Sequence, residues 1–102
     1  RKALMSDVTQ FEAVQFLEPA LEPGQRYTGP IETTLGVFEV EADAVAVGRA
    51  AWLAHRGSDT RDVAWWLVRV PGESLARWIA DSRSDVERVL DLTTKQLVEV
   101  RP

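Results

Sequence analysis

Residues 63–80, which read VAWWLVRVPGESLARWIA, decide the fold. β-branched and aromatic residues are frequent in this stretch, and Pro71-Gly72 near its centre is a turn signal. The pattern predicts two antiparallel strands, 63–70 and 74–81, joined by a tight turn. Because successive side chains of a strand point to opposite faces of a sheet, the adjacent Trp65 and Trp66 must lie on opposite faces.

The predicted turn also fixes which residues of the two strands lie opposite each other. A turn centred on Pro71-Gly72 makes the numbers of paired residues sum to 143, so Trp66 faces Arg77 and Trp65 faces Trp78. One face then carries Ala64, Trp66, Val68, Val70, Leu75 and Ile79, and the other carries Val63, Trp65, Leu67, Ala76, Trp78 and Ala80. We expect the first face to be the core beneath a helix. The second face is also apolar, which a sheet with one solvated face does not need. Arg77 either covers the Trp66 indole or extends along the margin of the sheet.

Three accounts compete for this second apolar face. The chain's own first 40 residues can cover it, since their aromatic and aliphatic side chains must pack somewhere. Alternatively, the face is a protein interface, most simply in a symmetric homodimer, because tryptophan is favoured at interface centres. A small-molecule pocket or stacking platform is the third account. The candidate interface or ligand residues are Trp65, Leu67, Arg69, Arg77 and Trp78.

The clearest helix begins at Ala42 or Asp43 and ends at Arg56. A carboxylate from Glu41 or Asp43 suits the free amides of the first turn, and Gly57 stands where a helix terminates. Apolar and small residues form two adjacent stripes: Ala44, Val47, Ala51 and Ala54, and then Val45, Gly48, Trp52 and His55. Small residues on the first stripe predict a close approach of the helix to the sheet.

The N-terminal residues are harder to assign. Residues 10–17 form either a strand or a short helix, because their periodicity decides neither. Two prolines and a glycine within residues 18–24 predict a surface connection. Residues 25–40 predict one or two strands, bent near Gly29-Pro30 or Gly36.

Two further strands, 86–92 and 96–101, follow the tryptophan hairpin. A three-residue loop, Thr93 to Lys95, makes paired numbers sum to 188 and predicts left-handed backbone at Lys95. This register places Leu90, Leu92, Val98 and Val100 on one face. The whole chain, 1–102, is therefore expected to be a single α+β domain. Its helix lies on one face of an antiparallel sheet that has a C-terminal four-strand meander and N-terminal strand segments.

The composition excludes several classes of protein. A chain of 102 residues that is 45% hydrophobic and 27% charged suits one globular core rather than a disordered segment. The absence of cysteine excludes a disulfide framework and cysteine-ligated metals. A net charge of -4, with acidic residues interleaved among the arginines, does not suit nucleic-acid binding. No apolar run is long enough for a membrane span or a secretory signal, so a cytoplasmic location is the default expectation. Arg1 to Leu4, which precede Met5, are interpreted as an expression remnant.

The sequence offers little chemistry, and no metal or cofactor is expected. His55 is the single histidine, and we interpret it as an imidazole placed favourably at the end of a helix. Nucleophile and phosphate-binding motifs are absent. Asp81, Asp85 and Asp91 border one loop, but their spacing matches no calcium loop. The sequence favours a non-enzymatic domain that acts through protein contact, as a homodimer, adaptor, immunity or regulatory protein. The alternative is a small-ligand or enzymatic domain with an apolar pocket between the sheet and the N-terminal segment.

Overall fold

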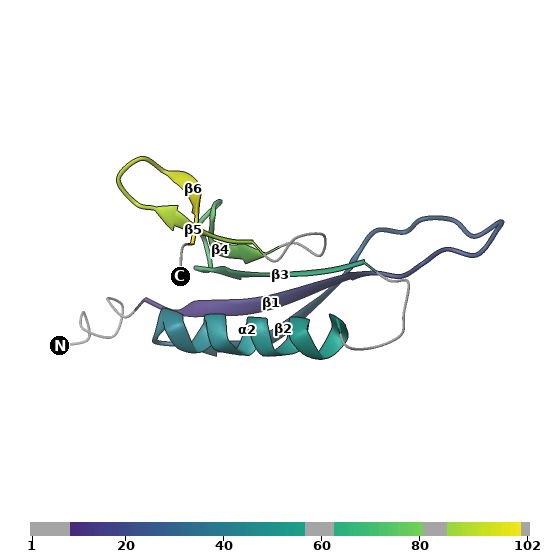
Figure 1. Cartoon of the computed structure of the whole chain (residues 1–102), viewed down its shortest axis with the longest axis horizontal. Helices are drawn as coiled ribbons and strands as arrows, with labels where there is room; N and C mark the ends of the chain where they lie inside the picture. The colour runs from purple at the N-terminus through teal and green to yellow at the C-terminus, as the bar shows by residue number, and fades with distance from the viewer. Residues whose placement is uncertain (1–8, 57–62, 81–85, 101–102) are drawn as a thin grey trace.

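The computed structural model describes residues 9–56, 63–80 and 86–100, and it shows one helix packed on a six-stranded sheet (Figure 1). In chain order the elements are β1 (Phe11–Glu18), β2 (Ile31–Phe38), α2 (Glu41–Arg56), β3 (Val63–Arg69), β4 (Ala76–Ala80), β5 (Glu87–Asp91) and β6 (Gln96–Glu99). The strand order is β2-β1-β3-β4-β5-β6, and all neighbouring strands are antiparallel. The α+β class and the C-terminal meander β3 to β6 are confirmed.

Residues 10–17, left open between strand and helix, supply strand β1 in the middle of the sheet. β1 pairs with β2 on one side and with β3 on the other. Since β1 is antiparallel to both, β2 and β3 run parallel to each other, and α2 connects them across one face. The helix therefore packs on β1, β2 and β3, while β5 and β6 extend beyond it.

The connection between β1 and β2 lies on the surface, as predicted. It spans residues 19–30 and projects past the end of the sheet (Figure 1). The Tyr27 hydroxyl, at 2.6 Å, donates a hydrogen bond to the Glu18 carboxylate and ties the connection to the end of β1. Residues 25–40 form only one strand, which begins after Pro30 and has an irregular register beside Gly36.

Helix α2 begins within two residues of the predicted start, and its buried residues are Ala44 of the first stripe and three residues of the second. Val45, Gly48 and Trp52 are buried, whereas Ala54, assigned to the first stripe, is exposed. Glu41 and Asp43 lie in the first turn, where carboxylates interact favourably with the helix dipole. The predicted terminator Gly57 lies outside the described residues.

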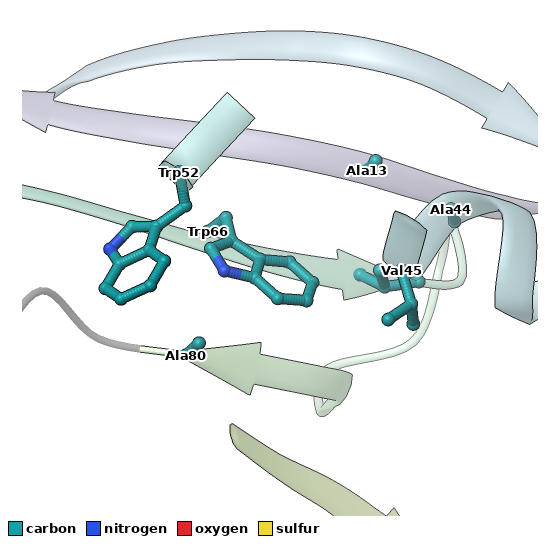
Figure 2. Packing of buried hydrophobic residues seen from close by; sticks show 7 residues of the cluster. Ala13, Ala44, Val45, Trp52, Trp66 and Ala80 are labelled. Carbon is teal, nitrogen blue, oxygen red and sulfur yellow. The ribbon is translucent and has the colours of Figure 1, made fainter. Parts of the chain in front are cut away.

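Trp66 fills the space between the helix and the sheet. Its side chain is fully buried among small residues that include Ala13 and Ala80, and Trp52 lies beside it (Figure 2). A Cβ atom at Gly48 would overlap the six-membered ring of this indole, so only glycine allows the helix backbone to approach so closely. Within the described structure the Trp66 Nε1 donor has no hydrogen-bond partner.

The predicted register of the tryptophan hairpin is wrong. Trp66 lies opposite Ala80, and Val68 lies opposite Trp78, so paired numbers sum to 146 rather than 143. Pro71-Gly72 do form a turn, with a φ of 92° at Gly72 and a 2.9 Å hydrogen bond from the Glu73 amide to the Val70 carbonyl. The chain then continues through residues 73–75 before β4 begins, and the register shifts again between Val68 and Arg69.

This shift of three residues exchanges the faces of β4, because side chains alternate with a period of two. Trp78 and Ala80 lie on the helix side with Trp66, and Ile79 lies on the opposite side with Leu67. Leu75, expected in the core, precedes the strand and is 44% exposed. The pair of Trp65 with Trp78 does not form.

The second hairpin has the predicted left-handed residue but a different register. Lys95 has a φ of 62°, yet Asp91 lies opposite Gln96 and Leu90 opposite Leu97, so the loop has four residues. The loop is closed by a 2.7 Å hydrogen bond from the Lys95 amide to the Asp91 carbonyl. Leu90 therefore shares a face with Leu97, and not with Val98 as predicted.

Candidate functional site

The sheet face opposite the helix, here called the open face, carries an apolar row that crosses β1, β3 and β4. Its residues are Val14, Phe16, Val63, Trp65, Leu67 and Ile79. Phe16 lies directly opposite Trp65, and their rings are stacked, with centroids 5.3 Å apart and planes inclined by 8°. Both side chains are half-buried. Of the elements that the structure describes, only α2 packs on a face of the sheet, and it packs on the other one.

An ion-pair network closes one end of the apolar row. The Arg69 Nε donates to Glu12 at 2.8 Å, and its Nη2 donates to Glu32 at 2.8 Å. Arg69 belongs to β3 and Glu32 to β2, so this side chain crosses the strand between them, where Val14 is fully buried. The Thr34 hydroxyl donates to the second Glu12 oxygen at 2.9 Å. The network thus shields Val14 and leaves the aromatic pair beyond it accessible.

The same contacts set the electrostatics of this end. The hydrogen bond from Arg69 holds the pKa of Glu12 below its ordinary value, against the opposing effect of burial, and the Thr34 hydroxyl adds to the lowering. In turn, the two carboxylates raise the pKa of Arg69. Glu12 and Arg69 therefore stay charged at neutral pH, and the open face has an apolar centre with a charged end.

The structure brings together only some of the predicted site residues. Trp65, Leu67 and Arg69 share the open face. Trp78 lies on the helix side, where its Nε1 donates to Glu87 at 2.9 Å. Arg77 does not lie opposite Trp66 as predicted, and its guanidinium lies 5.9 Å from the centre of the Phe11 ring. Sequence reasoning missed Phe16, because nothing local placed β1 beside β3, and it assigned Ile79 to the wrong face.

Within the first 40 residues, the described part, residues 9–40, does not cover the Trp65 face. They form β1 and β2, which lie in the same sheet and widen the open face instead of covering it. Phe11 and Phe38 pack on the helix side, and Phe16 joins the open face. For the same reason, no pocket lies between the sheet and a separate N-terminal layer in the described part of the chain.

Glu87 connects the helix to the distal strands. The Arg49 guanidinium donates two hydrogen bonds to this carboxylate, at 2.8 and 2.7 Å. The Arg49 hydrogen bond lowers the pKa of Glu87, burial opposes it, and the Trp78 indole contributes further lowering. Helix α2 is therefore attached to β5, with which it has little other contact.

Potential metal ligands are scattered in the described part of the chain. Among residues 9–56, 63–80 and 86–100, no group of three potential ligands could hold a metal ion. Asp91 accepts hydrogen bonds from the Thr93 and Thr94 amides, at 2.8 and 3.3 Å, and so stabilises its own loop. Asp81 and Asp85 lie outside the described residues. No helix in the described part is long and apolar enough to cross a membrane.

A separate cleft of about 420 Å³, here called the turn cleft, lies between the β3–β4 connection and the β5–β6 loop. It is lined by residues 72–75, Arg77, Leu90, Leu92 and Lys95. None of the open-face residues lines it, and neither Trp78 nor Tyr27 does. The candidate surfaces of the described chain are thus the open face and the turn cleft.

Comparison of the chain with protein-family models, curated proteins and solved structures gave no match. Function is therefore inferred from the geometry of these two surfaces.

Proposed function

We propose that this protein is a non-enzymatic domain that acts through protein contact, and that a second copy of the chain binds its open face. The observation that supports the proposal is the stacked pair of Phe16 and Trp65, which lies beside Leu67 and Ile79 on a face that no described element covers. Aromatic residues concentrate at the centres of protein interfaces and supply much of their binding energy.

The arrangement of charges agrees with an interface. The Arg69, Glu12 and Glu32 network lies at one end of the apolar row, so the carboxylates and the guanidinium are paired within the chain. A partner that covers the centre of the row can leave this network, and Arg88 opposite Ile79, at its margin. An apolar centre with a polar margin is the usual anatomy of such surfaces.

The amount of exposed surface also supports a partner. The chain exposes 7083 Å², whereas a compact folded monomer of this length exposes about 5,800 Å². Part of the excess belongs to the projecting residues 19–30. The whole excess, about 1,300 Å² with residues 19–30 included, compares with the roughly 800 Å² that each partner buries in a standard interface.

A symmetric dimer is the simplest assembly for this face. In a twofold arrangement the same patch serves both subunits, and two sheets packed face to face lie about 10 Å apart with interdigitating side chains. Trp65 of each chain would then lie near the centre of the contact. The resulting sandwich would have one helix on each outer side.

Light scattering coupled to size exclusion tests the proposal at tens of micromolar. We expect twice the chain mass for the wild type, and a dimer at least about tenfold weaker for Trp65→Glu, because a central aromatic residue is lost and a charge is buried. Leu67→Glu is an independent variant on the same face. Leu53→Glu is the matched control, since Leu53 is 51% exposed on the outer side of the helix.

Circular dichroism must show that each variant is folded. A wild-type chain that is monomeric at these concentrations would refute the homodimer. A dimer that both open-face variants retain would place the interface elsewhere.

A further inference from the structure

The turn cleft lies beside the connection between β3 and β4, which is longer than the sequence pattern predicted. Residues 73–75 separate the Pro71-Gly72 turn from β4, and they form one wall. The four-residue loop that ends at Lys95 forms the other. A volume of about 420 Å³ lies within the range of clefts that bind small organic molecules.

Three leucines give the cleft an apolar surface. Leu90 is 8% exposed, whereas Leu75 and Leu92 are 44% and 53% exposed. The last two belong to connections between strands, where exposed positions normally carry polar residues. Their packing leaves aliphatic surface facing the cleft and available to a ligand.

The charged side chains leave the cleft with one net positive charge. Arg77 donates two hydrogen bonds to the Glu73 carboxylate, at 2.9 and 3.0 Å, so these two charges neutralise each other. Lys95 acts on Glu73 only through its electric field, which contributes to lowering the pKa of that carboxylate. The Lys95 ammonium is therefore the cation of the cleft that can receive an anion.

The backbone of Lys95 adds a second argument. Its φ of 62° is a conformation that glycine or asparagine adopts at lower cost than lysine. Loop geometry thus gives no reason for a lysine here. A backbone outlier beside a cleft is a recognised feature of binding sites.

We propose that the turn cleft binds a small organic monoanion, with its carboxylate against Lys95 and an aliphatic group on Leu75, Leu90 and Leu92. Such a carboxylate occurs in alkyl acids and at the end of a peptide with an apolar last residue. The site shares no lining residue with the open face, so it does not depend on the proposed dimer.

Nuclear magnetic resonance titration of the full chain tests the site. The probes are N-acetyl-Leu-Leu with a free carboxylate, the same compound as its neutral C-terminal amide, and octanoate. We expect the free acid to shift the amide signals of residues 72–77 and 90–95, with the weak affinity usual for ligands of this size. The neutral amide should bind about tenfold more weakly, because it lacks the charged contact. Comparison of the free acid with octanoate then distinguishes a peptide terminus from an alkyl acid.

Two pairs of variants separate binding from folding. Lys95→Gly removes the ammonium at a position where glycine is favoured, so it should raise the midpoint of unfolding. The same variant should bind the free acid about tenfold more weakly. Lys95→Arg should keep most of the binding. Leu92→Thr should weaken binding of the free acid. Leu53→Thr, at a helix position of similar exposure, should leave that binding unchanged.

The proposal is overturned if neither carboxylate probe shifts the cleft signals. Equal binding of the acid and the amide, or undiminished binding to a folded Lys95→Gly variant, would overturn it as well. Signals that move mainly on the open face would locate the probe on that surface and likewise count against the cleft.

Discussion

The contact between Gly48 and Trp66 provides a prediction that opposes the usual rule for helices. Replacing a glycine by alanine within a helix normally stabilises a protein by about 1 kcal/mol, because alanine has the higher helix propensity. Gly48 lies inside α2, so propensity alone predicts that Gly48→Ala raises the free energy of unfolding.

Packing predicts the opposite sign. The added Cβ would overlap the six-membered ring of Trp66, and this ring is fully buried and surrounded by side chains of the core. The ring cannot move without displacing those neighbours, and overpacking of this kind costs about 1 to 3 kcal/mol. The gain in propensity offsets about 1 kcal/mol of this strain, so we expect Gly48→Ala to destabilise the protein by up to about 2 kcal/mol.

Urea unfolding followed by circular dichroism measures this difference. The midpoint of Gly48→Ala should fall by about 1 M at an unchanged slope. Ala46→Gly is the calibrating variant, because Ala46 is exposed in the same helix and reports propensity without packing. The free energy of unfolding of Ala46→Gly should be about 1 kcal/mol lower than that of the wild type.

A double-mutant cycle of Gly48→Ala and Trp66→Phe measures the energy of the overlap between the added Cβ and the Trp66 ring. Trp66→Phe removes part of the ring system, so Gly48→Ala should cost less in that background than in the wild type, by about 1 kcal/mol or more. A Gly48→Ala protein that is more stable than the wild type would refute the reasoning. Additive effects in the cycle would show that the two residues do not collide.

Two further predictions concern the hydrogen bonds of Glu87 and Asp91. Because the folded pKa of Glu87 lies below its ordinary value of 4.5, its ion pair with Arg49 contributes stability above that pH and loses it as the pH falls through the folded pKa. Arg49→Gln should therefore lower the free energy of unfolding, measured by urea titration, by up to about 1 kcal/mol at pH 7, since Arg49 is partly exposed, and by much less at pH 3. An equal loss at both pH values would contradict the pairing. Asp91→Ala should lower the free energy of unfolding by about 1 kcal/mol at pH 7, because it removes the acceptor of the Thr93 and Thr94 amides. An unchanged thermal midpoint would show that the loop does not need the Asp91 carboxylate.

Local signals predicted the elements well. The helix at Glu41–Arg56 follows from its apolar stripes and flanking carboxylates, and the four C-terminal strands follow from alternation and turn residues. These features depend on a few neighbouring residues, so the sequence displays them directly. Residues 10–17 were ambiguous because both faces of β1 are covered in part: the neighbours Ala13 and Val14 are both fully buried, so burial does not alternate along the strand.

Strand registers were harder to predict than the elements, because a turn signal does not indicate how many residues follow the turn before strand pairing resumes. Pro71-Gly72 indicated the turn correctly but not the extra residues 73–75, and this odd error moved Trp78 to the other face. Three of the five candidate site residues, Trp65, Leu67 and Arg69, nevertheless lie together. Phe16 could not be paired with Trp65, since their contact depends on a register between distant strands.

The central position of β1 also determines how the chain must fold. Its partners in β3 lie between 45 residues away, for Glu18 and Val63, and 57 residues away, for Glu12 and Arg69. The meander β3 to β6 has only local pairings, but without β1 and α2 its Trp66 side chain stays exposed, so it should not be stable on its own. Loop closure over such separations makes folding slow and concerted, so the N-terminal strand and the C-terminal meander should acquire protection from hydrogen exchange together.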